Sequence, residues 1–175
     1  YAWEEKEEGA LYSFVLWRAW TRFLYFLDMF LYRYKNLSLY IYIKKDKIFY
    51  IKPSISEEKE DIPKDLKDIF DGYFIDKKDI EDESPFHIPQ KYEDIYRYLK
   101  NHVKFGQVIS YKDLGNVLKL HPRTIAAAMR SNPLPIFIPC HRVVFKGFYR
   151  DKNQIGGYNR GVDVKVFLLR HENVL

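Results

Sequence analysis

Three prolines within seven residues place the strongest local constraint on what this chain can fold into. Pro133, Pro135 and Pro139 lie in an otherwise apolar segment at 133–139. Proline has no backbone N–H and a fixed φ, and it disfavours helical backbone in the residue before it. The segment is therefore predicted to be rigid and extended, and to hold the residues that follow it, beginning with Cys140, at a fixed place.

The two halves of the chain differ in charge. Residues 1–94 contain 15 Lys and Arg against 20 Asp and Glu, whereas residues 95–175 contain 14 against 4. The second half is thus a basic module, which suits a polyanion such as DNA, RNA or an acidic membrane surface. A solvated surface of Lys and Arg without a partner is the alternative. The hydrophobic content of 47% allows a buried core and argues against disorder throughout.

Cys140 is the single cysteine of the chain, so no intramolecular disulfide can form. This is typical of a reducing cytosol, and we expect a cytoplasmic protein, associated with the nucleoid if the source is prokaryotic. A zinc site built on several cysteines is excluded. The five scattered histidines include no HxxxH pair, so neither a metal site nor a cofactor is expected.

An aromatic and apolar stretch occupies residues 10–34 and is interrupted by Arg18, Arg22, Asp28 and Arg33. These four charges argue against a membrane-spanning helix. At 100° per residue, polar and apolar side chains fall largely on opposite sides, which predicts an amphipathic helix. We favour a helix packed on its own domain, and a membrane-surface or partner-binding helix is the alternative.

Two segments rich in Tyr and Ile follow, Leu37–Ile43 and Ile48–Ile51, and their alternation predicts a β-hairpin with 44–47 as its turn. Residues 53–89 hold many acids and four prolines, and Leu66, Ile69 and Phe70 predict a short helix within this looped region. We therefore expect an N-terminal α/β domain over 1–88, with the assignment of 1–36 resting on the helix pattern alone.

Residues 89–175 are predicted to form a mainly helical second domain, which makes the fold class α+β. Pro89 opens a helix that runs to about Lys104, and a closing helix spans 162–173. Ser110 caps a helix over 111–118, with Asp113 as its capping-box partner. Pro122 occupies the first position of a further helix over 123–130.

The helices at 111–118 and 123–130 are short and joined by a tight turn, which resembles a helix-turn-helix. An ordinary helical hairpin is the alternative, and the basic charge of this half favours DNA. Ala126, Ala127 and Ala128 keep one helix slim, so it can approach a neighbour or a DNA groove closely.

Cys140 is followed by His141 and Arg142, and Glu172 lies in the closing helix. A thiol is a nucleophile only as thiolate, so it needs a nearby base, and the base needs an orienting acid. His141 and Glu172 supply those two residue types. From composition alone, Cys140 is as well explained as a small buried hydrophobe, the commoner state of a lone cysteine.

The segment Ile138–Val144, with the order Ile-Pro-Cys-His-Arg-Val-Val, resembles the signature of the O6-alkylguanine-DNA alkyltransferases, the methylated-DNA–protein-cysteine methyltransferases. The agreement extends from about Val103 to Glu172, and several blocks in the right order make it specific. The N-terminal 90 residues match only loosely. The further matching blocks are Phe105–Tyr111, Ala128–Pro133, Gly157-Tyr158 with Gly161, and Leu168–Glu172.

The resemblance implies direct-reversal DNA repair. The alkyl group of O6-alkylguanine, or less well of O4-alkylthymine, would move once and irreversibly from double-stranded DNA to Cys140 after the nucleotide is flipped out of the duplex. It implies no cofactor and a monomer. His141 would take the thiol proton through a water, and Glu172 would orient His141. Tyr111 would help the guanine leave, and Asn132 would be a hinge between the helix-turn-helix and the cysteine loop.

The resemblance also implies a helix-turn-helix that enters the minor groove with little sequence readout, and an N-terminal ribonuclease-H-like sheet that the hairpin near 37–51 would represent. Arg123 would take the place of the extruded nucleotide. Asn159 and Arg160 depart from the small residues usual in the family. The other expected DNA-binding residues are Tyr111, Thr124, Ala126, Ala127 and Arg130, and the expected base pocket comprises Pro139, Val143, Tyr158 and Asn159 with carbonyls of Cys140 and Val143.

Three other functions fit parts of this sequence pattern. A non-catalytic protein that recognises alkylated DNA would lack the acceptor cysteine, which is present here. A helix-turn-helix transcription regulator would need a base-reading helix, and Ala126–Ala128 offers little to read with. A cysteine hydrolase would turn over repeatedly, whereas the alkyltransferase reacts once.

Overall fold

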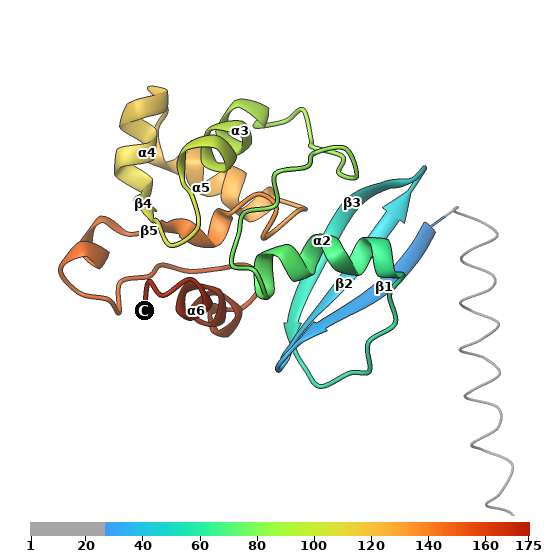
Figure 1. Cartoon of the computed structure of the whole chain (residues 1–175). Coiled ribbons are helices and arrows are strands. Elements are labelled where there is room, and N and C mark those ends of the chain that lie inside the picture. The colour runs from blue at the N-terminus through green and yellow to red at the C-terminus, as the bar shows by residue number, and fades with distance from the viewer. Residues whose placement is uncertain (1–26) are drawn as a thin grey trace, which may run out of the picture.

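Three antiparallel strands form a sheet in the order β1-β2-β3 at the start of residues 27–175, the part of the chain that the computed structural model describes (Figure 1). The predicted hairpin is confirmed, because β2 pairs with β3 and Lys45 and Asp46 form the turn between them, both with positive φ. A two-residue turn of this kind matches the twist of antiparallel strands. The strands are β1 Leu27–Tyr34, β2 Leu37–Lys44 and β3 Lys47–Ile55.

The predicted helix over 10–34 is wrong for residues 27–34, which form β1; residues 10–26 lie outside the described part of the chain. Tyr and Phe suit strands as well as helices, and the eight-residue pairing of β1 with β2 decides between them. Pro53, predicted to be part of a loop, lies in β3. Because β3 is the last strand of the sheet, this proline is tolerated there.

Short loop pairings cover parts of both outer strands. On the β1 side, Leu31 and Asp61 exchange two backbone hydrogen bonds of 2.8 and 2.9 Å. On the β3 side, Ile48 pairs with residues 85–87, and the Ile51 N–H donates to the carbonyl of Pro133 at 2.8 Å. The second bond joins the sheet to the segment that precedes Cys140.

Helix α2, Lys64–Phe74, lies across the sheet (Figure 1) and confirms the helix predicted from Leu66, Ile69 and Phe70. Phe70, Tyr73 and Phe74 are each no more than 1% exposed. Tyr32 of β1 packs on the ring of Phe74 at 5.5 Å and donates a 2.8 Å hydrogen bond to Asp71. Aromatic contacts therefore fix the helix on the sheet.

The C-terminal half is mainly helical, as predicted (Figure 1). The first helix begins at Glu93 rather than at Pro89, because Tyr92 adopts a left-handed conformation with φ 66°. The predicted cap of the second helix is confirmed, since Ser110 accepts a hydrogen bond from Asp113 N. The elements are α3 Glu93–His102, β4 Ile109–Ser110, α4 Tyr111–Leu118, α5 Pro122–Ser131, β5 Val143–Val144, parallel to β4, the short 3-10 helices η1 Cys140–Arg142 and η2 Lys146–Tyr149, and α6 Val162–His171.

The prediction that the segment 133–139 is extended throughout is wrong, because this segment forms a tight turn. Pro135 and Ile138 pair across it, and Ile136 has φ 78°. Asn132 makes the turn possible: its side chain accepts from Leu134 N at 2.9 Å and donates to the Ile138 carbonyl at 3.0 Å. Side-chain bonds of this kind offer the backbone an alternative to a strand.

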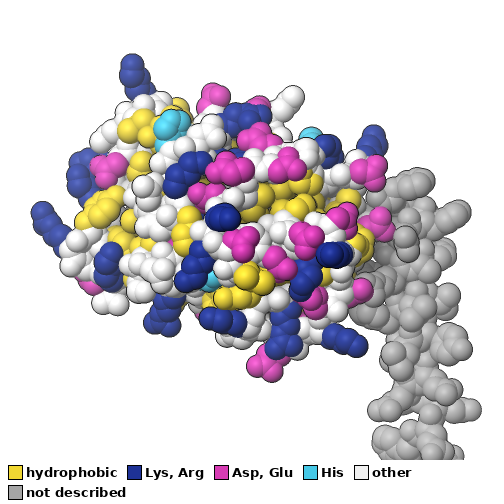
Figure 2. Space-filling view, viewed as in Figure 1, with side chains coloured by type: hydrophobic (Ala, Val, Ile, Leu, Met, Phe, Trp, Pro, Cys, Tyr) yellow, Lys and Arg dark blue, Asp and Glu magenta, His cyan; other side chains and the backbone are white. Residues whose placement is uncertain are grey.

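One continuous core joins the sheet, α2, α3, α5, the 134–143 segment and α6. Phe86, which follows the acidic loop, stacks on Phe137 with ring centroids 3.7 Å apart. Acidic side chains gather over the region of α2 and the sheet in the space-filling view (Figure 2). Within residues 27–175, every helix is too short or too polar to cross a bilayer.

Substitution by alanine is expected to change the stability in opposite directions at two glycines that lie in helices. Nothing lies within 4 Å of a Cβ added to Gly72 in α2, whereas a Cβ on Gly115 in α4 would lie 2.7 Å from the carbonyl oxygen of Leu120 in the α4–α5 turn. We expect Gly72→Ala to raise the free energy of unfolding by about 1 kcal/mol through helix propensity. We expect Gly115→Ala to lower it, as measured by urea denaturation. Equal stabilisation by both changes would contradict the close approach of this turn to α4.

Candidate active site

Cys140 begins η1 and is 3% exposed. Its Sγ lies 3.4 Å from the hydroxyl of Tyr158. Burial raises the pKa of the thiol, while hydrogen bonds from Tyr158 and Asn132 oppose the rise. The thiol is therefore protonated at neutral pH, and it needs a base to become a nucleophile.

His141 is fully buried next to Cys140, and its Nε2 lies 2.8 Å from Oε1 of Glu172. Burial lowers the pKa of His141, against the opposing influence of Glu172, so the imidazole is neutral at neutral pH. Because a carboxylate accepts, the geometry assigns the ring proton to Nε2. Nδ1 is buried and has no hydrogen-bond partner among residues 27–175, and it is the atom free to accept a proton.

Glu172 follows α6 and is held by Arg142. The guanidinium donates from Nε to Oε2 at 2.9 Å and from Nη2 to Oε1 at 2.9 Å. It also bonds Asp79 at 2.7 Å and the carbonyl of Val103 at 2.7 Å. Burial alone would raise the pKa of Glu172, but the hydrogen bonds from His141 and Arg142 and the charge of Arg142 lower it. Glu172 is therefore ionised and available to orient His141.

Two buried side chains at this site carried no signal in the sequence. The hydroxyl of Tyr73, from α2, donates to Glu172 Oε1 at 2.6 Å. The Lys165 ammonium, from α6, donates to the carbonyl of Val143 at 2.7 Å. Burial lowers the pKa of Lys165 to about 8, while Cys140 acts in the opposite direction. A tyrosine or lysine far from the cysteine motif could not be assigned to the site from spacing alone.

An open cavity of about 620 Å³ lies between α4, α5 and the loops that follow Cys140. Tyr111 lines it from the first turn of α4, and Tyr158, whose hydroxyl contacts Cys140, lines it from the opposite loop. Six predicted residues meet here: Tyr111, Arg123, Ala126, Arg130, Tyr158 and Asn159. The cavity also includes residues that the predicted set did not, namely Lys112, Pro122, Met129, Phe145, Lys146 and Gly157.

The remaining predicted residues do not line this cavity. Thr124 and Ala127 are on α5 but outside its lining, and Pro139 and Val143 are buried in the segment around Cys140. Asn132 follows the last residue of α5, and its side chain bonds the turn before Cys140. Its role as a hinge stays a prediction.

The two residues that depart from the family pattern make specific contacts. The side-chain amide of Asn159 donates to the carbonyl of Arg130. Arg160 contacts Tyr50 of β3, with its guanidinium 4.8 Å from the ring centroid, and donates to the Asn132 carbonyl at 3.0 Å. Arg160 therefore lies against the sheet rather than in the cavity.

Residues 27–175 contain no cluster of three or more His, Cys, Asp or Glu side chains placed to hold a metal ion. The site itself presents a buried thiol, a neutral imidazole and an ionised carboxylate, and Tyr158 connects the thiol to the open cavity. Such an arrangement activates a cysteine nucleophile.

The fold is mixed α+β, and the site groups a thiol, an imidazole and a carboxylate, the residue types that an activated cysteine requires. Residues 90–174 match the family model described as "6-O-methylguanine DNA methyltransferase, DNA binding domain". The methylated-DNA–protein-cysteine methyltransferase of Pyrococcus horikoshii is 34% identical over 122 residues, which are 70% of this chain and 67% of that protein. The chain belongs to the methylated-DNA–protein-cysteine methyltransferase family.

The protein of the same name from Methanocaldococcus vulcanius is 43% identical over 72 residues, so the match spans only 41% of that relative and 41% of this chain. Among solved structures, the O6-methylguanine-DNA methyltransferase of Pyrococcus kodakaraensis strain KOD1 superposes with a TM-score of 0.66 at 25% identity, covering 85% of this chain and 99% of that one. A Mycobacterium tuberculosis OGT in complex with DNA shares the fold, with a TM-score of 0.62 at 17% identity over 83% of this chain and 92% of that one.

The buried histidine and carboxylate predict that acid destabilises the protein. As the pH falls, a histidine in the unfolded chain binds a proton near its ordinary pKa of 6.5, and a glutamate near 4.5. His141 and Glu172 of the folded protein bind a proton only at lower pH, because their pKa values are lowered. The unfolded state therefore binds more protons, and stability falls as the pH falls. The free energy of unfolding, measured in urea, should decrease between pH 6.5 and 4.5 and decrease further below 4.5.

His141→Gln should remove part of the decrease between pH 6.5 and 4.5, and the part below 4.5 should remain. His171, whose pKa is also lowered by burial, contributes the same sign in both proteins. His102→Gln, at an exposed position at the end of α3, is the matched control. A wild-type stability that does not change across this range would contradict the assignment of a neutral His141.

Proposed function

We propose that this protein repairs alkylated DNA by direct reversal, as a single-turnover methylated-DNA–protein-cysteine S-methyltransferase. The observation that carries the proposal is the buried thiol of Cys140 beside His141, which is neutral, has a free Nδ1 and is bonded to ionised Glu172. The substrate is O6-alkylguanine, and less well O4-alkylthymine, in double-stranded DNA.

The proposed reaction is an in-line displacement at the alkyl carbon. His141 Nδ1 takes the thiol proton through a water, and Glu172 stabilises the resulting imidazolium. The Cys140 sulfur forms a bond to the alkyl carbon as the carbon–O6 bond breaks, and that electron pair leaves with the guanine. Tyr111 lines the cavity, and burial raises the pKa of its hydroxyl. It therefore stays protonated and can supply the proton with which the base leaves neutral.

The product is a thioether, which no side chain of the site can reverse. Each molecule therefore acts once, and no cofactor takes part. The cavity in front of Cys140 would receive the flipped nucleotide, because a stacked guanine does not present O6 to a buried sulfur. Tyr158 and Asn159 line it from the loop before α6, and the carbonyls of Cys140 and Val143 would read the guanine amino group.

DNA binding is assigned to α4 and α5, read as a helix-turn-helix. Arg123 is exposed at the start of α5 and lines the cavity, which suits a side chain that fills the space of an extruded nucleotide. Ala126 and Ala127 let α5 approach a minor groove closely. Thr124 and Arg130 lie on the same helix and would contact the backbone of the DNA.

The domain assignment follows from these roles. Residues 1–88 are proposed as a structural domain whose sheet and α2 correspond to the family's ribonuclease-H-like fold, and residues 89–175 as the DNA-binding and alkyl-acceptor domain. A monomeric state is proposed from the family resemblance, and a cytoplasmic location from the composition.

Intact mass spectrometry tests the reaction directly. After mixing with a short duplex that carries one O6-methylguanine, the wild-type protein should gain one methyl group and then stop, because Cys140 is the only cysteine. Cys140→Ala should gain none and still bind the duplex. Binding by both proteins without any gain in mass would leave a non-catalytic alkylated-DNA recognition protein.

Arg123→Ala tests the insertion role. We expect a drop in the first-order rate of methyl transfer at saturating duplex, on the order of tenfold or more, because an unfilled duplex favours the return of the flipped base, whose unstacking costs a few kcal/mol. Arg170→Ala is the matched control, because it removes the same charge from the exposed surface of α6, where Arg170 lines a different cavity. Equal rates for the two variants would contradict the insertion role.

A further inference from the structure

The hydroxyl of Tyr73 meets the histidine–carboxylate pair from the side of α2. It donates to Glu172 Oε1 at 2.6 Å and lies 3.4 Å from His141 Nε2. The side chain is 1% exposed. Burial, together with the charge of Glu172, raises the pKa of this phenol well above its usual value. The hydroxyl therefore stays protonated and acts as a donor to the carboxylate.

The geometry around Nε2 leaves one tautomer of His141. The single proton of the Tyr73 hydroxyl is committed to Glu172, so only the oxygen lone pairs face Nε2. Glu172 Oε1 likewise presents only lone pairs to Nε2, at 2.8 Å. Two acceptors at Nε2 require that this nitrogen carry the ring proton. Nδ1 is then the basic nitrogen, and it has no hydrogen-bond partner among residues 27–175.

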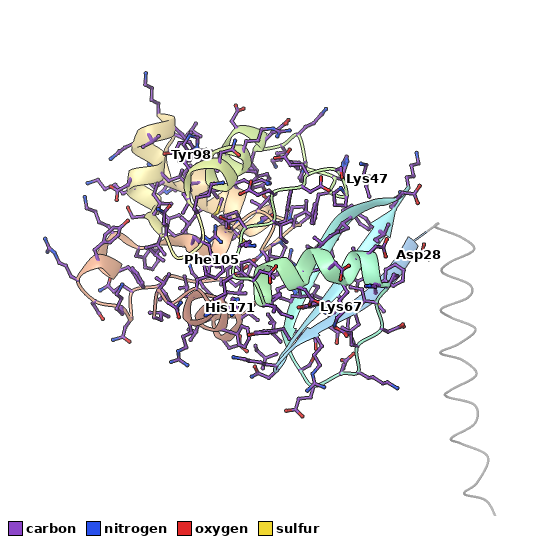
Figure 3. The ribbon with its side chains drawn as sticks, in the orientation of Figure 1. Asp28, Lys47, Lys67, Tyr98, Phe105 and His171 are labelled. Atoms are coloured by element: carbon purple, nitrogen blue, oxygen red, sulfur yellow. The ribbon has the colours of Figure 1, made fainter. Side chains whose placement is uncertain are left out.

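The position of Tyr73 is set by its ring rather than by its hydroxyl. The ring packs edge-on against Phe74 at 4.8 Å and against Phe105 at 5.6 Å, and lies 5.4 Å from His171. Phe105 and His171 lie close together beside the end of α2 (Figure 3), with ring centroids 5.8 Å apart. A phenylalanine at this position keeps these ring contacts and loses only the two contacts of the hydroxyl, with Glu172 and with His141 Nε2.

We propose that Tyr73 is a positioning residue for alkyl transfer, which fixes the Nε2–H tautomer of His141 by holding Glu172 against Nε2 and presenting an acceptor to Nε2. This inference rests on the proposed function. Tyr73 contacts neither the thiol nor the cavity in front of it, so it acts through Glu172 and His141. One consequence is that α2, in the acidic half of the chain, supplies a part of the relay that the segment 89–175 lacks.

The test compares Tyr73→Phe with Tyr32→Phe. Tyr32 is the matched control because it is also buried, donates to a carboxylate, Asp71, and packs on α2, away from His141. Single-turnover methyl transfer should slow on the order of tenfold in Tyr73→Phe, the size expected for one lost hydrogen bond to a charged group. Tyr32→Phe should react at the wild-type rate. Equal rates for wild type and Tyr73→Phe would overturn the proposal.

The pH dependence of the rate separates positioning from packing. Without the Tyr73 hydroxyl, Glu172 is held less firmly against Nε2 and stabilises the imidazolium of His141 less, so the acidic limb of the pH–rate profile should move to lower pH. A uniform loss of rate with an unmoved limb would overturn the proposal, because it would indicate a packing defect. Both variants keep the charged and titratable groups that face His141. These groups are Cys140, Arg142, Lys165 and Glu172, with Asp79 behind Arg142.

Long-range proton–nitrogen NMR of the full chain reads the tautomer without DNA and without catalysis. His141, assigned by comparison with His141→Gln, should carry its proton on Nε2 in the wild type and should populate Nδ1–H more in Tyr73→Phe. A wild-type His141 protonated on Nδ1 would overturn the proposal even if Tyr73→Phe failed to fold. A wild-type protein that transfers no methyl group would refute the proposed function, and the NMR result would still decide the role of Tyr73.

Discussion

Arg142 places a guanidinium charge in the interior of the protein, where Glu172 and Asp79 neutralise it. A buried charge is costly unless it is paired and its donors are satisfied, and here three groups share the task, the third being the carbonyl of Val103. These partners come from the α2–α3 connection, the end of α3 and the end of α6. The segment that carries the cysteine can therefore adopt its buried position only when all three are assembled around it.

The electrostatics of the thiol site follow from that arrangement. Arg142 keeps Glu172 ionised, and ionised Glu172 orients a His141 that burial keeps neutral. The thiol itself is held in the un-ionised form by burial. The thiol is therefore a weak nucleophile until a base takes its proton, because only the thiolate is reactive.

Local chemistry explains which parts of the fold could be predicted. Ser110 caps α4, Pro122 occupies the first position of α5, and the cysteine motif is contiguous, so the sequence alone predicted α4, α5 and the Cys140–His141 pair. The helix prediction fails at 27–34 because the aromatic residues there fit the periodicity of a helix or of a strand, and only the pairing with β2 decides between the two. Tyr73 lies 99 residues from Glu172, and no local pattern indicates such a contact. The turn at 133–139 depends on side-chain bonds of Asn132, which backbone preferences do not reveal.

The loop pairings on the outer strands of the sheet affect the tendency of the protein to aggregate. A three-stranded sheet exposes two rows of unpaired N–H and C=O groups, which can template pairing with another chain. Asp61 occupies part of the row on β1, and residues 85–87 with Pro133 occupy part of the row on β3. The hydrogen bond that attaches the cysteine segment to the sheet thus also shortens a free edge, so the contacts that build the reactive site help to keep the protein from aggregating.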